Sequence, residues 1–167
     1  DIVRVVATTT MLADLCQQLG GSSVDVHSIM SPGGDPHLYT PTPSDAQAVA
    51  EAHVVVTSGL GLEGWIDDLV ANGEPPLVAS ADLAPIRHAD FPGGVDPHFW
   101  TDPMQMALVV EGMLPFLQDH VEFADPAAVQ ASADDYIAEL TALADDIQVM
   151  VDTVAVEDRK LVTNHEA

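Results

Sequence analysis

The chain has 167 residues, 47% of them hydrophobic, so it can bury a sizeable core and is not a disordered segment. Four Lys and Arg residues stand against 27 Asp and Glu residues, and the resulting formal net charge of -23 at pH 7 excludes a nucleic-acid partner. A surface of this charge attracts cations, although solubility at high salt would select the same composition, and the charge alone leaves both explanations open.

Strand and helix patterns alternate through the first eighty residues. Strands are predicted at 2–8, 24–30, 53–58 and 76–80, and helices at 11–19, from Ser44 onward, and at 62–72. Ser44 with Gln47 three residues later matches a capping box. Such alternation predicts an α/β fold in which helices flank a parallel four-stranded sheet.

The single cysteine, Cys16, falls within the first predicted helix. One cysteine excludes an internal disulfide. Cys16 shares helical spacing with Leu12, Leu15 and Leu19, which predicts a small buried side chain rather than a reactive thiol.

Two Asp-Pro pairs mark the starts of helices in the second half of the chain. Asp102-Pro103 supplies an N-cap and a first-turn proline, and Asp125-Pro126 does the same for a much longer pattern. That second helix has nearly thirty residues, or about 40 Å at 1.5 Å per residue, which predicts a spine between two lobes. The run "LVTN" at 161–164 then predicts the first strand of a truncated second lobe.

These patterns predict three parts of the chain. An N-terminal lobe covers 1–122, a long linking helix covers 123–156, and the start of an incomplete C-terminal lobe covers 157–167. The chain begins "DIVRVVATTT" without Met, which is typical of a mature or engineered start.

The tripeptide Asp-Pro-His occurs twice, each time shortly after a pair of glycines. His37 and His98 both follow predicted strands, at the sheet edge where open α/β folds bind ligands. The prolines stiffen each loop, and His165 follows another strand-like run. Three histidines at strand ends predict a transition-metal site, although three unrelated loop histidines would show the same spacing.

The segment "GLGLEG" at 59–64 matches a dinucleotide-binding fingerprint. It follows a predicted strand, but Glu63 would compete with a pyrophosphate for the helix amides, and the fingerprint normally follows the first strand. The interpretation favoured is therefore that Gly59 and Gly61 are turn residues and that Glu63 is a helix-dipole partner.

Six stretches together resemble the zinc- and manganese-binding solute receptors of bacterial ABC importers. They are "VVATTTMLADL", "DPHLYTPTPSD", "SGLGLEGW", "DPHFWTDP", the long helix and "LVTNHEA". The resemblance implies two α/β lobes joined by a rigid helix, with the metal held in the cleft. By position it implies that His37 and His98 are first-lobe ligands and that His165 is the first ligand of the second lobe. The family's fourth ligand, an acidic residue far along the second lobe, has no counterpart in these residues.

The predicted function is extracytoplasmic capture of a divalent metal ion for delivery to an ABC permease, with no reaction catalysed. A nitrogen-rich ligand set favours Zn²⁺ over Mn²⁺. The localisation is periplasmic or at the cell surface, and lipid tethering is left open.

Two other classes of function use the same residues differently. In a metal-dependent hydrolase, His37 and His98 would be ligands of a metal ion whose open position carries an activated water, with Asp35 or Glu63 as a nominal general base. In an interaction protein, the acidic surface itself would bind the partner.

Overall fold

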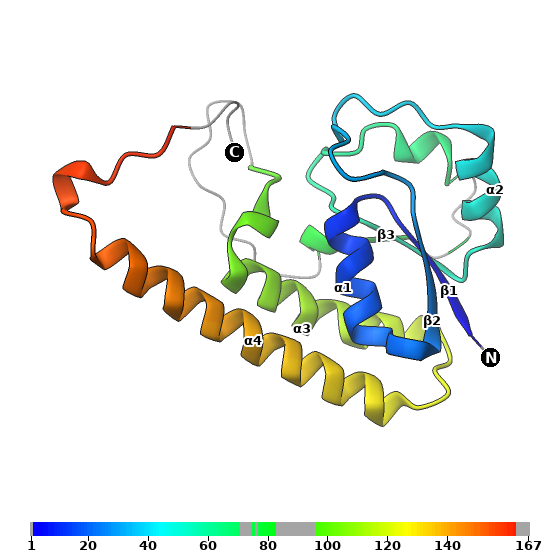
Figure 1. Ribbon diagram of the computed structural model, residues 1–167. Helices are drawn as coiled ribbons and strands as arrows, with labels where there is room; N and C mark the ends of the chain where they lie inside the picture. Colours follow the sequence, from blue (N-terminus) through cyan, green and yellow to red (C-terminus); the bar gives the residue numbers. More distant parts are fainter. Residues whose placement is uncertain (1, 71–74, 76, 83–95, 163–167) are drawn as a thin grey trace.

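The computed structural model describes residues 2–70, 75, 77–82 and 96–162 and contains one parallel sheet (Figure 1). Its strands are β1 (Val3–Ala7), β2 (Val24–Ser28), β3 (Val54–Thr57) and β4 (Leu77–Ala79). Their order is β2-β1-β3-β4, and every neighbouring pair is parallel. The predicted four-stranded parallel sheet is confirmed.

In the described part of the chain, four α-helices accompany the sheet. They are α1 (Thr10–Gly20), α2 (Pro43–Glu51), α3 (Pro103–His120) and α4 (Pro126–Asp152). Short 3-10 turns lie at Gly21–Ser23, Ile66–Asp68, Ser80–Asp82, Phe99–Thr101 and Val156–Asp158. The predicted N-caps Asp102 and Asp125 accept from the amides of Met104 and Ala128, respectively.

Two local predictions were wrong. The capping box of α2 consists of Thr42 and Asp45 rather than Ser44 and Gln47. The segment predicted as a helix at 62–72 forms turns and the 3-10 helix Ile66–Asp68, while 71 and 72 lie outside the described residues. Residues 59 to 61 all have positive φ, with values of 82°, 56° and 78°, and this left-handed turn replaces a regular helix start.

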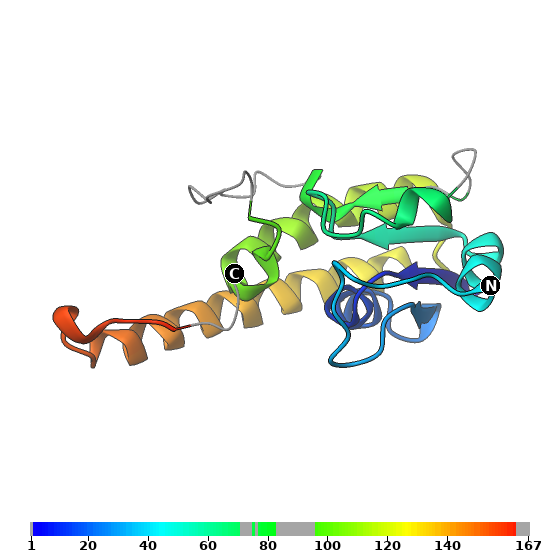
Figure 2. The same cartoon turned by 90° about the horizontal axis from the view of Figure 1, so that it is seen from above.

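The sheet is covered on both faces, as Figure 2 shows from above. Val5 and Val56 point into a core built with α1, α3 and α4, whereas Val6 and Val55 point into a smaller core with Trp65 and α2. Successive strand residues face opposite sides, so both faces must be apolar. This explains the nearly unbroken valine runs.

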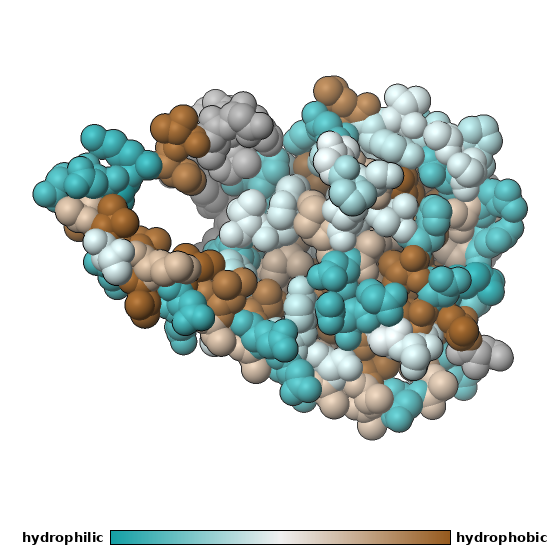
Figure 3. Space-filling model, in the orientation of Figure 1, coloured by the Kyte–Doolittle hydropathy of each residue, from teal (hydrophilic) through white to brown (hydrophobic). Residues whose placement is uncertain are grey.

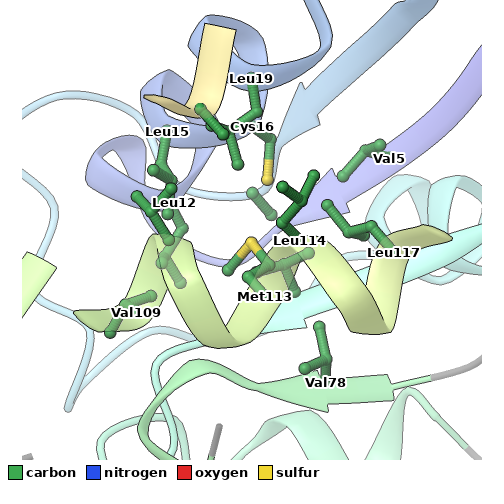
Figure 4. Close-up of a cluster of buried hydrophobic side chains, with 14 of the residues drawn as sticks. Val5, Leu12, Leu15, Cys16, Leu19, Val78, Val109, Met113, Leu114 and Leu117 are labelled. Atoms are coloured by element: carbon green, nitrogen blue, oxygen red, sulfur yellow. The ribbon is translucent and has the colours of Figure 1, made fainter. Parts of the chain in front are cut away.

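The thiol of Cys16 lies inside the larger core, between α1 and the sheet (Figure 4). It is 2% exposed, and burial raises its pKa to about 12. Because the thiolate is the reactive form, we expect the folded chain to resist alkylation at neutral pH and to react on unfolding in urea. A time course with iodoacetamide and mass detection checks this. Fast labelling of the folded chain would show that α1 does not pack as described.

Helix α4 packs against the lobe along only part of its length. Val129, Ala133 and Leu140 are buried with α1 and α3, but the last three turns extend past them (Figure 1). Apolar side chains on the extending part are exposed, as the brown atoms along α4 in Figure 3 illustrate. They include Leu143, Ile147, Val149, Met150 and Val151.

The predicted strand at 161–164 is not present in its described part, because Leu161 and Val162 are exposed and belong to no strand. Residues 163 and 164 lie outside the described residues. Helix α4 lies within the segment 123–156, which was predicted as the long linking helix. Among the described residues, none of the helices is both long enough and apolar enough to cross a bilayer.

Candidate metal centre

His98 is held by contacts within its own loop. Its side chain is nearly buried, at 5% exposed, and its Nδ1 lies 2.7 Å from Oδ1 of Asp96. The same oxygen accepts from the His98 amide at 2.9 Å. The Thr101 hydroxyl donates to the His98 carbonyl at 2.8 Å, just before α3 begins. His98 is therefore a fixed side chain on a loop attached to a long helix.

The loop of His37 is held from outside by an aromatic side chain. The indole of Trp65 donates to the Pro36 carbonyl at 2.9 Å, and the Trp65 ring packs against Tyr39 with centroids 5.0 Å apart. Within the loop, Oδ1 of Asp35 accepts from the His37 amide at 2.9 Å. The His37 side chain itself is exposed. The first ligand loop thus has a fixed backbone and an accessible imidazole.

The far end of this loop is tied to α2 through Asp45. Its carboxylate accepts from the Tyr39 hydroxyl at 2.8 Å and from the Thr42 amide at 2.7 Å. Burial opposes its ionisation, but these hydrogen bonds outweigh burial and lower the pKa of Asp45. The carboxylate therefore stays ionised at neutral pH and keeps Tyr39 in place beside Trp65.

The two loops bring His37 and His98 together although they are about sixty residues apart in the sequence. Their ring centroids lie 5.7 Å apart at an interplanar angle of 66°. Two imidazoles bound tetrahedrally to one zinc would have centroids about 5 Å apart, given Zn–N bonds of roughly 2.0–2.1 Å. A small movement of the exposed His37 ring would be enough to share an ion.

Two imidazoles do not make a complete zinc site, which uses three or four protein ligands. The described residues include no group of three His, Cys, Asp or Glu side chains that could hold a metal ion. His165, the third predicted ligand, lies outside the described residues. The assignment of all three histidines as metal ligands therefore remains a prediction.

The glycine-rich segment does not form a nucleotide site. Glu63 is 3% exposed, and its Oε1 accepts from the Thr8 hydroxyl at 2.6 Å and the Ser58 amide at 2.7 Å. Its Oε2 accepts from the Gly59 amide at 3.2 Å. Thr8 and Ser58 follow β1 and β3, where the strand order reverses and where such folds anchor ligands. The Glu63 carboxylate already accepts hydrogen bonds from the donors that a nucleotide phosphate would need. It links the ends of β1 and β3 rather than capping a helix, so its predicted role as a helix-dipole partner is wrong.

These contacts also remove the support for a hydrolase. Glu63 is buried in structural hydrogen bonds, and Asp35 holds the turn before His37. No observation in the described residues favours catalysis over binding.

Comparison with known proteins decides the family. Residues 5–167 match the family described as ZnuA, zinc-uptake complex component A, periplasmic. The chain belongs to this family. The predicted resemblance is confirmed, and so is the expectation of a binding protein, because the ZnuA family consists of substrate-binding proteins of ABC importers rather than enzymes.

Individual relatives show how far the likeness extends. The manganese-binding lipoprotein MntA of Halalkalibacterium halodurans is 32% identical over 99% of this chain and 55% of its own length. The iron ABC transporter substrate-binding lipoprotein MtsA of Streptococcus pyogenes serotype M1 is 26% identical over 99% of this chain and 56% of its own length. The periplasmic zinc binding protein TroA from Treponema pallidum aligns in structure with a TM-score of 0.86 and 25% identity, covering 100% of this chain and 61% of its own.

Two consequences follow for this ZnuA-family chain. It spans about half the length of the curated relatives it matches. The relatives are periplasmic proteins or lipoproteins, which confirms the predicted extracytoplasmic localisation. Their names cite manganese, iron and zinc, so family membership does not single out one ion.

Proposed function

We propose that this chain provides the first-lobe half of a site that captures a divalent transition metal ion, with zinc favoured, for delivery to an ABC permease. The observation that carries this proposal is the approach of His37 and His98 to a ring separation of 5.7 Å, from loops that come after β2 and β4 in the chain. Open parallel sheets bind ligands beyond the carboxyl ends of their strands. The acidic surface, with a net charge of -23, would raise the local concentration of cations.

Zinc is the favoured ion because both first-lobe groups are imidazoles. Imidazole suits zinc, whereas manganese accepts more oxygen ligands. The third proposed ligand, His165, would add another nitrogen. Competing titrations with zinc and manganese would separate the two, and tighter binding of manganese would overturn the preference.

The remaining ligands are proposed to come from a second lobe that follows α4. Relatives are nearly twice as long as this chain, and the exposed apolar side chains on the last turns of α4 would be covered by such a lobe. His165 would then be the first ligand from that lobe, and the metal would be held between the two lobes.

Zinc binding should change the fluorescence of Trp100. Its ring lies 5.2 Å from the His98 imidazole, centroid to centroid, so an ion bound at His98 changes the field at the indole. We expect micromolar zinc to quench or shift the emission at neutral pH, in a titration that saturates and is reversed by a chelator.

Removing the Trp100 indole provides the control. A Trp100→Phe variant should bind zinc by calorimetry but lose most of the fluorescence response, because its ring is the one that lies beside the His98 imidazole. A flat calorimetric titration together with an unchanged spectrum would contradict metal capture by this chain.

A further inference from the structure

The two Asp-Pro-His loops share one backbone hydrogen bond and differ in a side-chain contact. In each loop the aspartate Oδ1 accepts from the amide of the histidine two residues later, at 2.9 Å in both cases. In the second loop, Oδ1 of Asp96 also lies 2.7 Å from Nδ1 of His98. Among the described residues, Asp35 makes no matching bond to an imidazole. The two loops therefore share a sequence but differ in whether the aspartate contacts the histidine ring.

The Asp96 contact determines which ring nitrogen of His98 carries the hydrogen. An ionised carboxylate can only accept a hydrogen bond, so Nδ1 must carry the hydrogen. In a neutral imidazole the lone pair then belongs to Nε2. The Thr101 hydroxyl holds the His98 carbonyl, and Phe99 beside it is buried, so the loop cannot easily turn the other nitrogen outward.

We infer that Asp96 is a positioning residue, which holds His98 in the tautomer that offers Nε2 to the metal. His98 is then the ligand arranged before binding, and the more exposed His37 completes the pair by a small movement. Histidines that bind metals commonly donate their other N–H to a carboxylate, which fixes the tautomer and raises the basicity of the binding nitrogen. This inference rests on the proposed function, because it assigns a task within the same site.

The same substitution in both loops tests it. Asp96→Ala and Asp35→Ala each remove the oxygen that accepts from the histidine amide, so both loops lose the same turn hydrogen bond. Only Asp96→Ala also removes the acceptor of an imidazole Nδ1. We expect its dissociation constant for zinc, measured by calorimetry, to rise by about 10- to 100-fold. Asp35→Ala loses only the turn hydrogen bond, so its dissociation constant should rise clearly less. Equal losses in the two variants would overturn the inference.

A measurement without metal separates positioning from direct ligation. Nitrogen-15 NMR of the imidazoles should show His98 with its hydrogen on Nδ1 in the unsubstituted chain and in Asp35→Ala, and a mixture of tautomers in Asp96→Ala, where Nδ1 has lost its acceptor. Weakened binding with an unchanged tautomer would mean that Asp96 is itself a ligand, which contradicts the inference. If the unsubstituted chain bound no zinc, the proposed function would fail, while the tautomer would still show whether Asp96 positions the ring.

Discussion

Replacing His98 with alanine should abolish tight zinc binding while leaving the fold intact. His98 is the buried, hydrogen-bonded member of the pair, and its loss would leave one exposed imidazole in the described part of the site. Removing a partner behind a ligand already costs about 10- to 100-fold in metal affinity, so removing the ligand itself should cost at least ~100-fold. Calorimetric titration with zinc measures the effect, and circular dichroism checks the fold.

His120→Ala is the matched control, because it removes an exposed histidine from the far end of α3. That helix has 18 residues, which places His120 roughly 27 Å along its axis from the ligand loop. The control should bind zinc normally. His165→Ala tests the third proposed ligand in the same assay, and an affinity unchanged by this substitution would remove His165 from the site. If His98→Ala bound as tightly as the control, His98 would not be a ligand.

Replacing Glu63 with alanine should strongly lower the stability of the fold. The substitution leaves the Thr8 hydroxyl and the amides of Ser58 and Gly59 without their acceptor at a buried position. Each unsatisfied buried group costs about 1–3 kcal/mol, and water entering the space would recover part of it. We expect the free energy of unfolding in urea to fall by roughly 3–5 kcal/mol.

Two further variants make the Glu63 result specific. Asp67→Ala removes an exposed acid from the adjacent 3-10 helix and should change stability by less than about 0.5 kcal/mol. Glu63→Gln keeps an oxygen for Thr8 and Ser58 but presents an amide to Gly59, so its loss should be intermediate. If Glu63→Ala lowered the free energy of unfolding no more than Asp67→Ala does, the Glu63 carboxylate would not be what links the ends of β1 and β3.

Most of the fold could be predicted because its signals are local. Short apolar runs identified the four strands of the described sheet, and Asp-Pro pairs identified the starts of α3 and α4. The helix predicted at 62–72 failed because Leu62, Trp65 and Ile66 are buried by turns as well as they would be by a helix. Apolar spacing alone does not distinguish the two. The start of α2 was misplaced by two residues, although Pro43 in its first turn points to Thr42 as the N-cap.

The candidate site was predictable only in part. The repeated Asp-Pro-His indicated His37 and His98, and the structure brings their rings to within 5.7 Å, centroid to centroid. The support for those loops was missed. Trp65 reaches Pro36 across 29 residues, and no spacing in the sequence predicts that contact. The contact of Asp96 with the His98 ring was missed because both loops carry the same aspartate and only their side-chain geometry differs.

X-ray absorption at the zinc edge of the loaded, purified chain tests the central claim most directly, because it identifies the atoms bound to the ion. Capture by His37 and His98 predicts imidazole nitrogen ligands at about 2.0–2.1 Å, with the multiple-scattering pattern of at least two rings. That pattern should weaken in His98→Ala and persist in His120→Ala. A zinc ion surrounded only by oxygen, or a spectrum identical in all three chains, would contradict the assignment of these histidines to a metal site.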